Sequence, residues 1–130
     1  MVIDTSVLVA ILFGEPEASS LARALEADPV RLIATPSLLE TSIVIQSELE
    51  DEGMRELDLL MHTASISPVA FSADHYRVAR EAYRRFGKGR HPAALNYGDC
   101  FSYALSRASG EPLLFKGEDF KKTDVAPVLL

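Results

Sequence analysis

Four acidic residues occur where strands end or helices begin in the expected fold, and they are the first candidates for chemistry. Asp4 directly follows a short apolar run, and Asp119 lies in a turn after a second apolar run. Glu40 and Asp99 are expected in the first turns of two helices. In open α/β sheets, ligands bind outside the carboxyl ends of the strands, so these positions could share one cleft.

Such a cluster of acids needs a cation. Carboxylates a few ångströms apart repel by about 1 to 4 kcal/mol per pair, depending on the effective dielectric. Oxygen ligands without nearby His or Cys favour Mg²⁺, or Mn²⁺, over zinc, with Asp4 and Asp99 as the expected ligands. Magnesium keeps waters and bridges to substrate phosphates, which suits phosphodiester hydrolysis. The alternative is that each acid only caps or solvates a helix end, and this is most plausible for Glu40.

The hydrophobic pattern predicts the elements that would position these acids. Short apolar runs alternate with helical periodicity, which indicates an α/β domain with a parallel β-sheet flanked by helices. Strands are expected at residues 1–3, 30–34, 66–71, 112–115 and 125–130. Helices are expected at 5–13, 16–27, 37–50, 54–65, 73–86 and 97–109. Thr5 or Ser6 is expected to cap the first helix and Asn96 the last.

Composition places the chain among ordinary globular proteins. It has 130 residues, enough for one domain over 1–130, with 48% hydrophobic and 25% charged residues. No apolar run approaches the roughly 18 to 20 residues that span a bilayer, and no basic region precedes the first apolar stretch. The single cysteine, Cys100, agrees with a reducing compartment. We therefore expect a cytoplasmic protein without a membrane partner.

Several segments together carry a family resemblance. Val2 to Ser6, the acid Glu40, the run from His91 to Cys100 and the tail from Leu113 to Phe120 resemble a PIN domain. More narrowly, they resemble the VapC toxins of bacterial toxin–antitoxin pairs. The resemblance covers nearly the whole chain. It implies a PIN-like parallel sheet wrapped by helices, a homodimer, and an antitoxin protein that blocks the cleft.

The resemblance also implies an activity with assigned residues. The family is a group of single-strand-directed, Mg²⁺-dependent endoribonucleases, here the toxin of a type II toxin–antitoxin module, which hydrolyse RNA by a metal-activated water. Asp4, Glu40, Asp99 and Asp119 match its acidic positions, and Ser6 its small polar position. Glu118 stands where relatives often have Asp, and Asp119 is preferred because it directly precedes Phe120.

Charge and apolar patterning indicate where RNA and protein partners would bind. The net charge is −6, yet the segment from Arg77 to Arg90 contains six Lys or Arg residues. This basic run is expected near the mouth of the cleft. Within that run, Arg84, Arg85 and Lys88 are candidate contacts to the RNA backbone, although a solvated helix surface is the alternative. The expected helices at 37–50 and 54–65 carry more apolar residues than one core-facing stripe requires. That surplus predicts a homodimer, and an antitoxin segment could use the same region.

Three other functions can be weighed on sequence. A phosphatase of the haloacid dehalogenase type needs a second Asp two residues after the first, where this chain has Ser6. A receiver domain gains support from Lys116 but lacks its adjacent acidic pair after the first strand. A non-catalytic protein that only binds antitoxin and RNA stays open.

Overall fold

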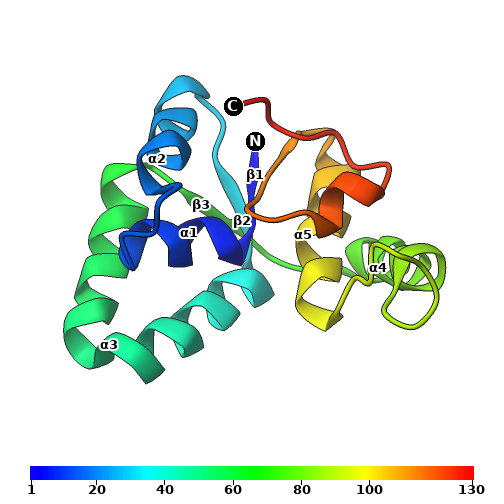
Figure 1. The fold of residues 1–130 in the computed structure, drawn as a ribbon, viewed down its shortest axis with the longest axis horizontal. Helices are drawn as coiled ribbons and strands as arrows, with labels where there is room; N and C mark the ends of the chain where they lie inside the picture. Colours follow the sequence, from blue (N-terminus) through cyan, green and yellow to red (C-terminus); the bar gives the residue numbers. More distant parts are fainter.

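A four-stranded parallel sheet forms the centre of the computed structural model, which describes residues 1–130 (Figure 1). The strands are β1 (Val2–Ile3), β2 (Leu32–Ala34), β3 (Ser67–Val69) and β4 (Leu113–Leu114), in the order β3-β2-β1-β4. Val2 of the central strand lies opposite Leu32 on one side and Leu113 on the other. Because every pairing is parallel, all carboxyl ends lie at one edge, as the sequence predicts.

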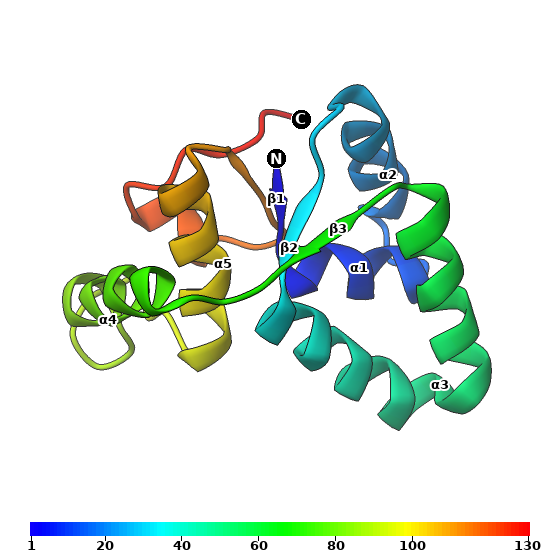
Figure 2. The same ribbon diagram turned by 180° about the vertical axis from the view of Figure 1, so that it is seen from behind.

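Five α-helices cover the two faces of this sheet. They are α1 (Thr5–Leu12), α2 (Ala18–Ala27), α3 (Thr35–Thr63), α4 (Ala73–Phe86) and α5 (Tyr97–Ser109). Both ribbon views place α1, α2 and α3 on one side of the strands and α4, α5 and the C-terminal segment on the other (Figures 1 and 2). The α/β prediction with helices on both faces is therefore confirmed. None of the helices combines the length and the apolar character needed to cross a bilayer.

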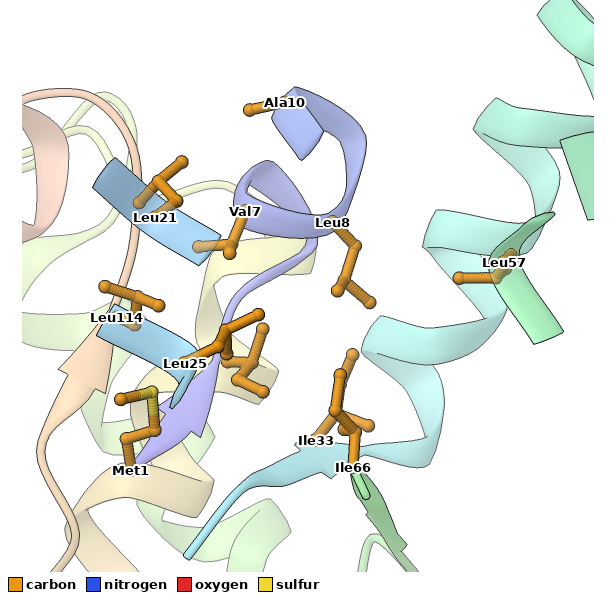
Figure 3. Packing of buried hydrophobic residues seen from close by; sticks show 11 residues of the cluster. Met1, Val7, Leu8, Ala10, Leu21, Leu25, Ile33, Leu57, Ile66 and Leu114 are labelled. Atoms are coloured by element: carbon orange, nitrogen blue, oxygen red, sulfur yellow. The ribbon is translucent and has the colours of Figure 1, made fainter. Parts of the chain in front are cut away.

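The core is split into two apolar clusters by the sheet. Successive strand residues point to opposite faces, so Ile3 joins one cluster and Val2 the other. The first cluster packs strand residues against α1, α2 and the second half of α3, with Leu8, Leu25 and Leu57 among its members (Figure 3). The second packs them against α4, α5 and Phe120. Burial on both faces explains why β1, β2 and β4 read as continuous apolar runs, whereas the edge strand β3 contains Ser67 and Pro68 and is largely exposed.

The last expected strand, at 125–130, is wrong. This segment forms only an isolated bridge between Leu113 and Pro127. The N–H groups of Leu113 and Val128 still donate across it, to Ala126 O at 2.8 Å and to Leu113 O at 2.9 Å. These two hydrogen bonds flank Pro127, and no backbone hydrogen bond between Phe115 and residues 128–130 continues the ladder.

Two predictions about the helices also need correction. The expected helices at 37–50 and 54–65 are the two arms of α3, joined at a kink where Glu50 has φ 55° and ψ −149°. In α4, helical spacing predicts an inner face of Tyr76, Ala79, Tyr83 and Phe86. The buried residues are instead Ala82 and Phe86, and Tyr76 and Tyr83 are exposed. Tyrosine is amphipathic and occurs on both buried and exposed helix faces, so the spacing of tyrosines alone did not identify the buried face of α4.

Candidate active site

Asp4 lies at the carboxyl end of β1 and is almost fully buried, at 6% exposure. It caps α1, because its Oδ2 accepts a hydrogen bond of 3.0 Å from the N–H of Ser6. The prediction that Thr5 or Ser6 caps this helix is therefore wrong: Thr5 is already the first helical residue. The other carboxylate oxygen, Oδ1, accepts a hydrogen bond of 2.6 Å from the hydroxyl of Ser102. Both oxygens of Asp4 are thus held in fixed directions.

Ser102 is a site residue that sequence reasoning missed. It is fully buried on α5, and its hydroxyl also lies 3.4 Å from that of Ser37 on α3. Ser102 follows Asp99 by three residues, so both side chains lie on the same face of the helix. The spacing of Asp99, Ser102 and Ser106 along one helix face was the available signal. The Ser102 hydroxyl ties Asp4 to the helix that carries Asp99.

Glu40 reaches the site from α3. The helix begins at Thr35, so Glu40 lies in its second turn rather than in the first turn expected. Its Oε1 accepts a hydrogen bond of 3.2 Å from the hydroxyl of Thr5. A Cβ atom added to Gly98 would lie only 2.6 and 2.7 Å from the two Glu40 carboxylate oxygens. The Glu40 carboxylate therefore packs directly on the first turn of α5, in a space that only a glycine leaves open.

Asp99 lies in that same turn and is the most perturbed acid of the site. Its carboxylate accepts a 3.0 Å hydrogen bond from Asn96 N–H, and Asn96 accepts one of 2.9 Å in return, so the predicted Asn96 cap is confirmed. Burial raises the pKa of Asp99 to about 6, helped by nearby negative charge and opposed by the Asn96 hydrogen bond. The acids that supply this charge are Asp4, Asp119 and Glu40.

The pKa of Glu40 is also raised. Burial is the largest cause and the charge of Asp4 adds to it, whereas the Thr5 hydrogen bond acts in the opposite direction. The structure thus brings Asp4, Glu40 and Asp119 close enough to Asp99 for their charges to interact. A cation placed among them would relieve that repulsion.

Asp119 and its neighbour Glu118 have different surroundings. Asp119 begins the short 3₁₀ helix η1 (Asp119–Lys122), and its charge acts on Asp99. The carboxylate of Glu118 instead pairs with Lys121 Nζ at 3.0 Å, and both side chains are exposed. Ser6 fixes this segment, because its hydroxyl oxygen accepts a hydrogen bond of 3.0 Å from the N–H of Lys116. That bond joins the start of α1 to the end of β4.

The donor set of this site fits a hard divalent cation. It offers carboxylate and hydroxyl oxygens, which Mg²⁺ and Mn²⁺ prefer. No three His, Cys, Asp or Glu side chains are grouped closely enough to hold a metal ion by themselves. Magnesium does not require such a cage, since it is usually bound through one or two carboxylates and several waters. Asp4 and Asp99 are the residues that would hold it.

Some cations of the basic run on α4 and the following loop form ion pairs with carboxylates, and others do not. Arg84 binds Glu81 at 2.5 Å, and Arg85 binds Asp124 at 3.3 Å. Of the three candidate RNA contacts, only Lys88 forms no ion pair, a property it shares with Arg80 and Arg90. The cations without a carboxylate partner are therefore only partly those that the sequence suggested.

Comparison with known proteins agrees with this geometry. A family model described as the PIN domain matches residues 1–126. A protein named Ribonuclease VapC from Mycolicibacterium smegmatis is 62% identical over 128 residues, covering 98% of this chain and 99% of that protein.

Solved structures share the fold at low sequence identity. The crystal structure of VapC20 from Mycobacterium tuberculosis, described as a sarcin-ricin loop cleaving toxin, superposes with a TM-score of 0.79 at 18% identity, covering 98% of this chain and 97% of the other. VapBC2 from Rickettsia felis, bound to a DNA fragment from its promoter, gives 0.75 at 16% identity, covering 97% and 94%. The chain belongs to the PIN-domain family and, within it, to the VapC ribonucleases.

Proposed function

We propose that this chain is a Mg²⁺-dependent endoribonuclease, acting as the toxin of a type II toxin–antitoxin module. The proposal rests on the cluster of acids around Asp99. Burial and three neighbouring carboxylates raise the pKa of Asp99 to about 6. A fold without catalytic need gains nothing from such repulsion. Membership of the VapC ribonucleases supplies the reaction class, hydrolysis of RNA phosphodiester bonds.

The roles follow from how each side chain is held. Asp4 and Asp99 would hold Mg²⁺, which supplies charge neutralisation at the phosphate and lowers the pKa of water. Ser102 and the Ser6 N–H keep the Asp4 carboxylate in one orientation. Glu40 and Asp119, whose charges both act on Asp99, would orient water for in-line attack on phosphorus, with the ribose 3′-oxygen as the leaving group. Ser6 positions the segment that carries Asp119.

The same proposal names two protein partners. A solved structure described as a toxin–antitoxin complex from Klebsiella pneumoniae contains a chain of this fold, with a TM-score of 0.69 at 18% identity, covering 95% of this chain and 92% of that chain. We propose a cognate antitoxin for this chain as well. A second copy of the chain is the other partner, because α3 exposes Leu39 by 61% and Ile43 by 58%, one helical turn apart.

Replacing the central acid tests the activity. Asp99→Asn should reduce Mg²⁺-dependent cleavage of single-stranded RNA to background, because one ion ligand loses its charge. Its amide oxygen can still accept from Asn96 N–H, so the α5 cap should remain, and the metal-free variant should melt no earlier than the wild type. Cleavage is measured on a labelled RNA with and without EDTA.

Matched substitutions make that test specific. Asp119→Asn should also lose cleavage, whereas Glu118→Gln should keep it, since Glu118 pairs only with Lys121. Wild-type cleavage that persists in EDTA, or an Asp99→Asn variant as active as the wild type, would contradict the proposal. A protein that binds RNA without cleaving it would favour the non-catalytic alternative.

Gly98 gives a second test of the site. Gly98→Ala should displace the Glu40 carboxylate, which is the mobile end of a flexible side chain, and so should change stability by less than about 1 kcal/mol. Cleavage should fall by about tenfold or more, since misplacement by an ångström is costly in catalysis. In a Glu40→Ala background, Gly98→Ala should have no further effect on the cleavage rate. An unchanged rate in the single variant would remove Glu40 from the mechanism.

The homodimer is tested by sedimentation. The wild type should sediment as a dimer at micromolar concentration, and Ile43→Glu should weaken the dimer by placing a charge on the apolar surface of α3. Glu48→Gln also changes the charge by one unit at an exposed position of α3, but on a face turned away from Leu39 and Ile43, and it should leave the dimer intact. A wild-type monomer under these conditions would contradict the dimer.

A further inference from the structure

A groove between α4 and α5 is the largest feature of the surface that the proposed chemistry leaves unused. Its volume is about 730 Å³, and its lining is mainly apolar and aromatic. The residues on which its character depends are Tyr76, Tyr83, Tyr97, Phe101, Arg80 and Lys88. In Figures 1 and 2, α4 and α5 lie side by side, across the sheet from the second arm of α3.

The aromatic side chains of the groove present ring surface to solvent. Tyr97 is 80% exposed, Tyr76 53% and Tyr83 40%. They are three of the four tyrosines of the chain, and the fourth, Tyr103, is buried. Exposed rings gathered in one groove are unusual for a surface without a ligand, because each leaves a large apolar area in water.

These rings are held in place by their neighbours. Tyr97 packs edge to face on Phe101, with centroids 4.8 Å apart, and Phe101 packs in the same way on Phe71 at 4.9 Å. The hydroxyl of Tyr83 donates to the carbonyl of Lys88 at 3.4 Å. A rigid aromatic wall loses little side-chain entropy when a flat ligand stacks on it.

The charge of the groove favours an anionic ligand. Arg80 and Lys88 line it, and neither forms an ion pair with a carboxylate. Elsewhere on α4 the arginines are compensated: Arg77 pairs with Asp74, and Arg84 with Glu81. Arg80 and Lys88, which line the groove together with the aromatic rings, therefore keep a positive charge that no carboxylate neutralises, although the chain as a whole has a net charge of −6. Flat rings beside free cations form the combination that binds single-stranded nucleic acid, through base stacking and backbone attraction.

The groove and the acid site share the start of α5. Tyr97 and Cys100 line the groove and belong to the same first helical turn as Asp99, and Asn96, which also lines the groove, caps that turn. A strand whose phosphodiester lies at Asp99 would therefore have its next nucleotides beside Tyr97 and Tyr83.

We propose that this groove is the subsite that takes one or more unstacked bases of the RNA strand next to the cleaved bond. The RNA part of this inference rests on the proposed function, whereas base stacking rests on the groove itself. Tyr97 and Tyr83 supply the stacking faces, and Arg80 and Lys88 contact the flanking phosphates. The groove thus selects single strands, since bases within a duplex cannot leave their stack without cost.

The experiment compares substitutions that distinguish stacking on an aromatic ring from contact with any apolar side chain. Tyr83→Leu and Tyr97→Leu keep an apolar side chain, and Tyr83→Phe and Tyr97→Phe keep the ring. Binding of a short single-stranded RNA carrying 2-aminopurine is measured by its fluorescence in EDTA, where no cleavage occurs. The Leu variants should bind about tenfold more weakly and quench the probe less, and the Phe variants should bind like the wild type. An RNA with abasic sites at the probe position should bind the wild type as weakly as the normal RNA binds the Leu variants.

Two results would overturn the inference. If the Leu and Phe variants bind the RNA equally well, no base stacks in the groove. If the Leu variants keep full RNA affinity but sediment differently from the wild type, the groove contacts a second copy of the chain instead. Thermal melting of each variant should match the wild type, because these tyrosines are exposed. Failure of the proposed nuclease activity would appear separately, as wild-type RNA binding without Mg²⁺-dependent cleavage.

Discussion

The repulsion among carboxylates at one edge of the sheet is the constraint on which the rest of this structure depends. Parallel pairing brings the ends of β1 and β4 together, and the second turn of α3 and the first turn of α5 reach the same edge. Asp99 then has charged neighbours and little water, which raises its pKa to about 6. The two apolar clusters on either side of the sheet must hold these elements together against that repulsion.

The acids of the site also form hydrogen bonds that stabilise the fold, and these bonds offset part of the repulsion between their charges. Asp4 caps α1, and Asp99 completes the capping box of α5 with Asn96. Ser102 donates to Asp4, and Thr5 to Glu40, so part of each lost hydration is replaced. The reading of these acids as helix caps and the reading of them as ion ligands are therefore compatible, because one carboxylate has enough lone pairs for both.

Much of this arrangement could be predicted from sequence, for identifiable reasons. Strands buried on both faces leave continuous apolar runs, and Asn96 and Gly110 mark the ends of α5 through local backbone chemistry. The last strand was predicted wrongly, because 125–130 has strand composition but its backbone pairs with β4 only around Pro127. Ser102 and the exposed Tyr83 were not assigned correctly because their roles depend on contacts between helices distant in sequence. Pairing of Arg84 with Glu81 likewise depends on rotamers, which a basic run does not reveal.

The ionisation of Asp99 is the most direct test of whether the carboxylates at this edge of the sheet repel one another and bind a cation. Its pKa is raised from 3.8 to about 6, so between these values the folded metal-free chain binds a proton that the unfolded chain has lost, and stability falls as pH rises through this window. The carboxyl carbon of Asp99 can be followed by NMR during a pH titration of the metal-free protein and again with Mg²⁺. We expect a midpoint near 6 without the ion and a clearly lower one with it. A midpoint at the ordinary value for Asp, unchanged by Mg²⁺, would contradict it.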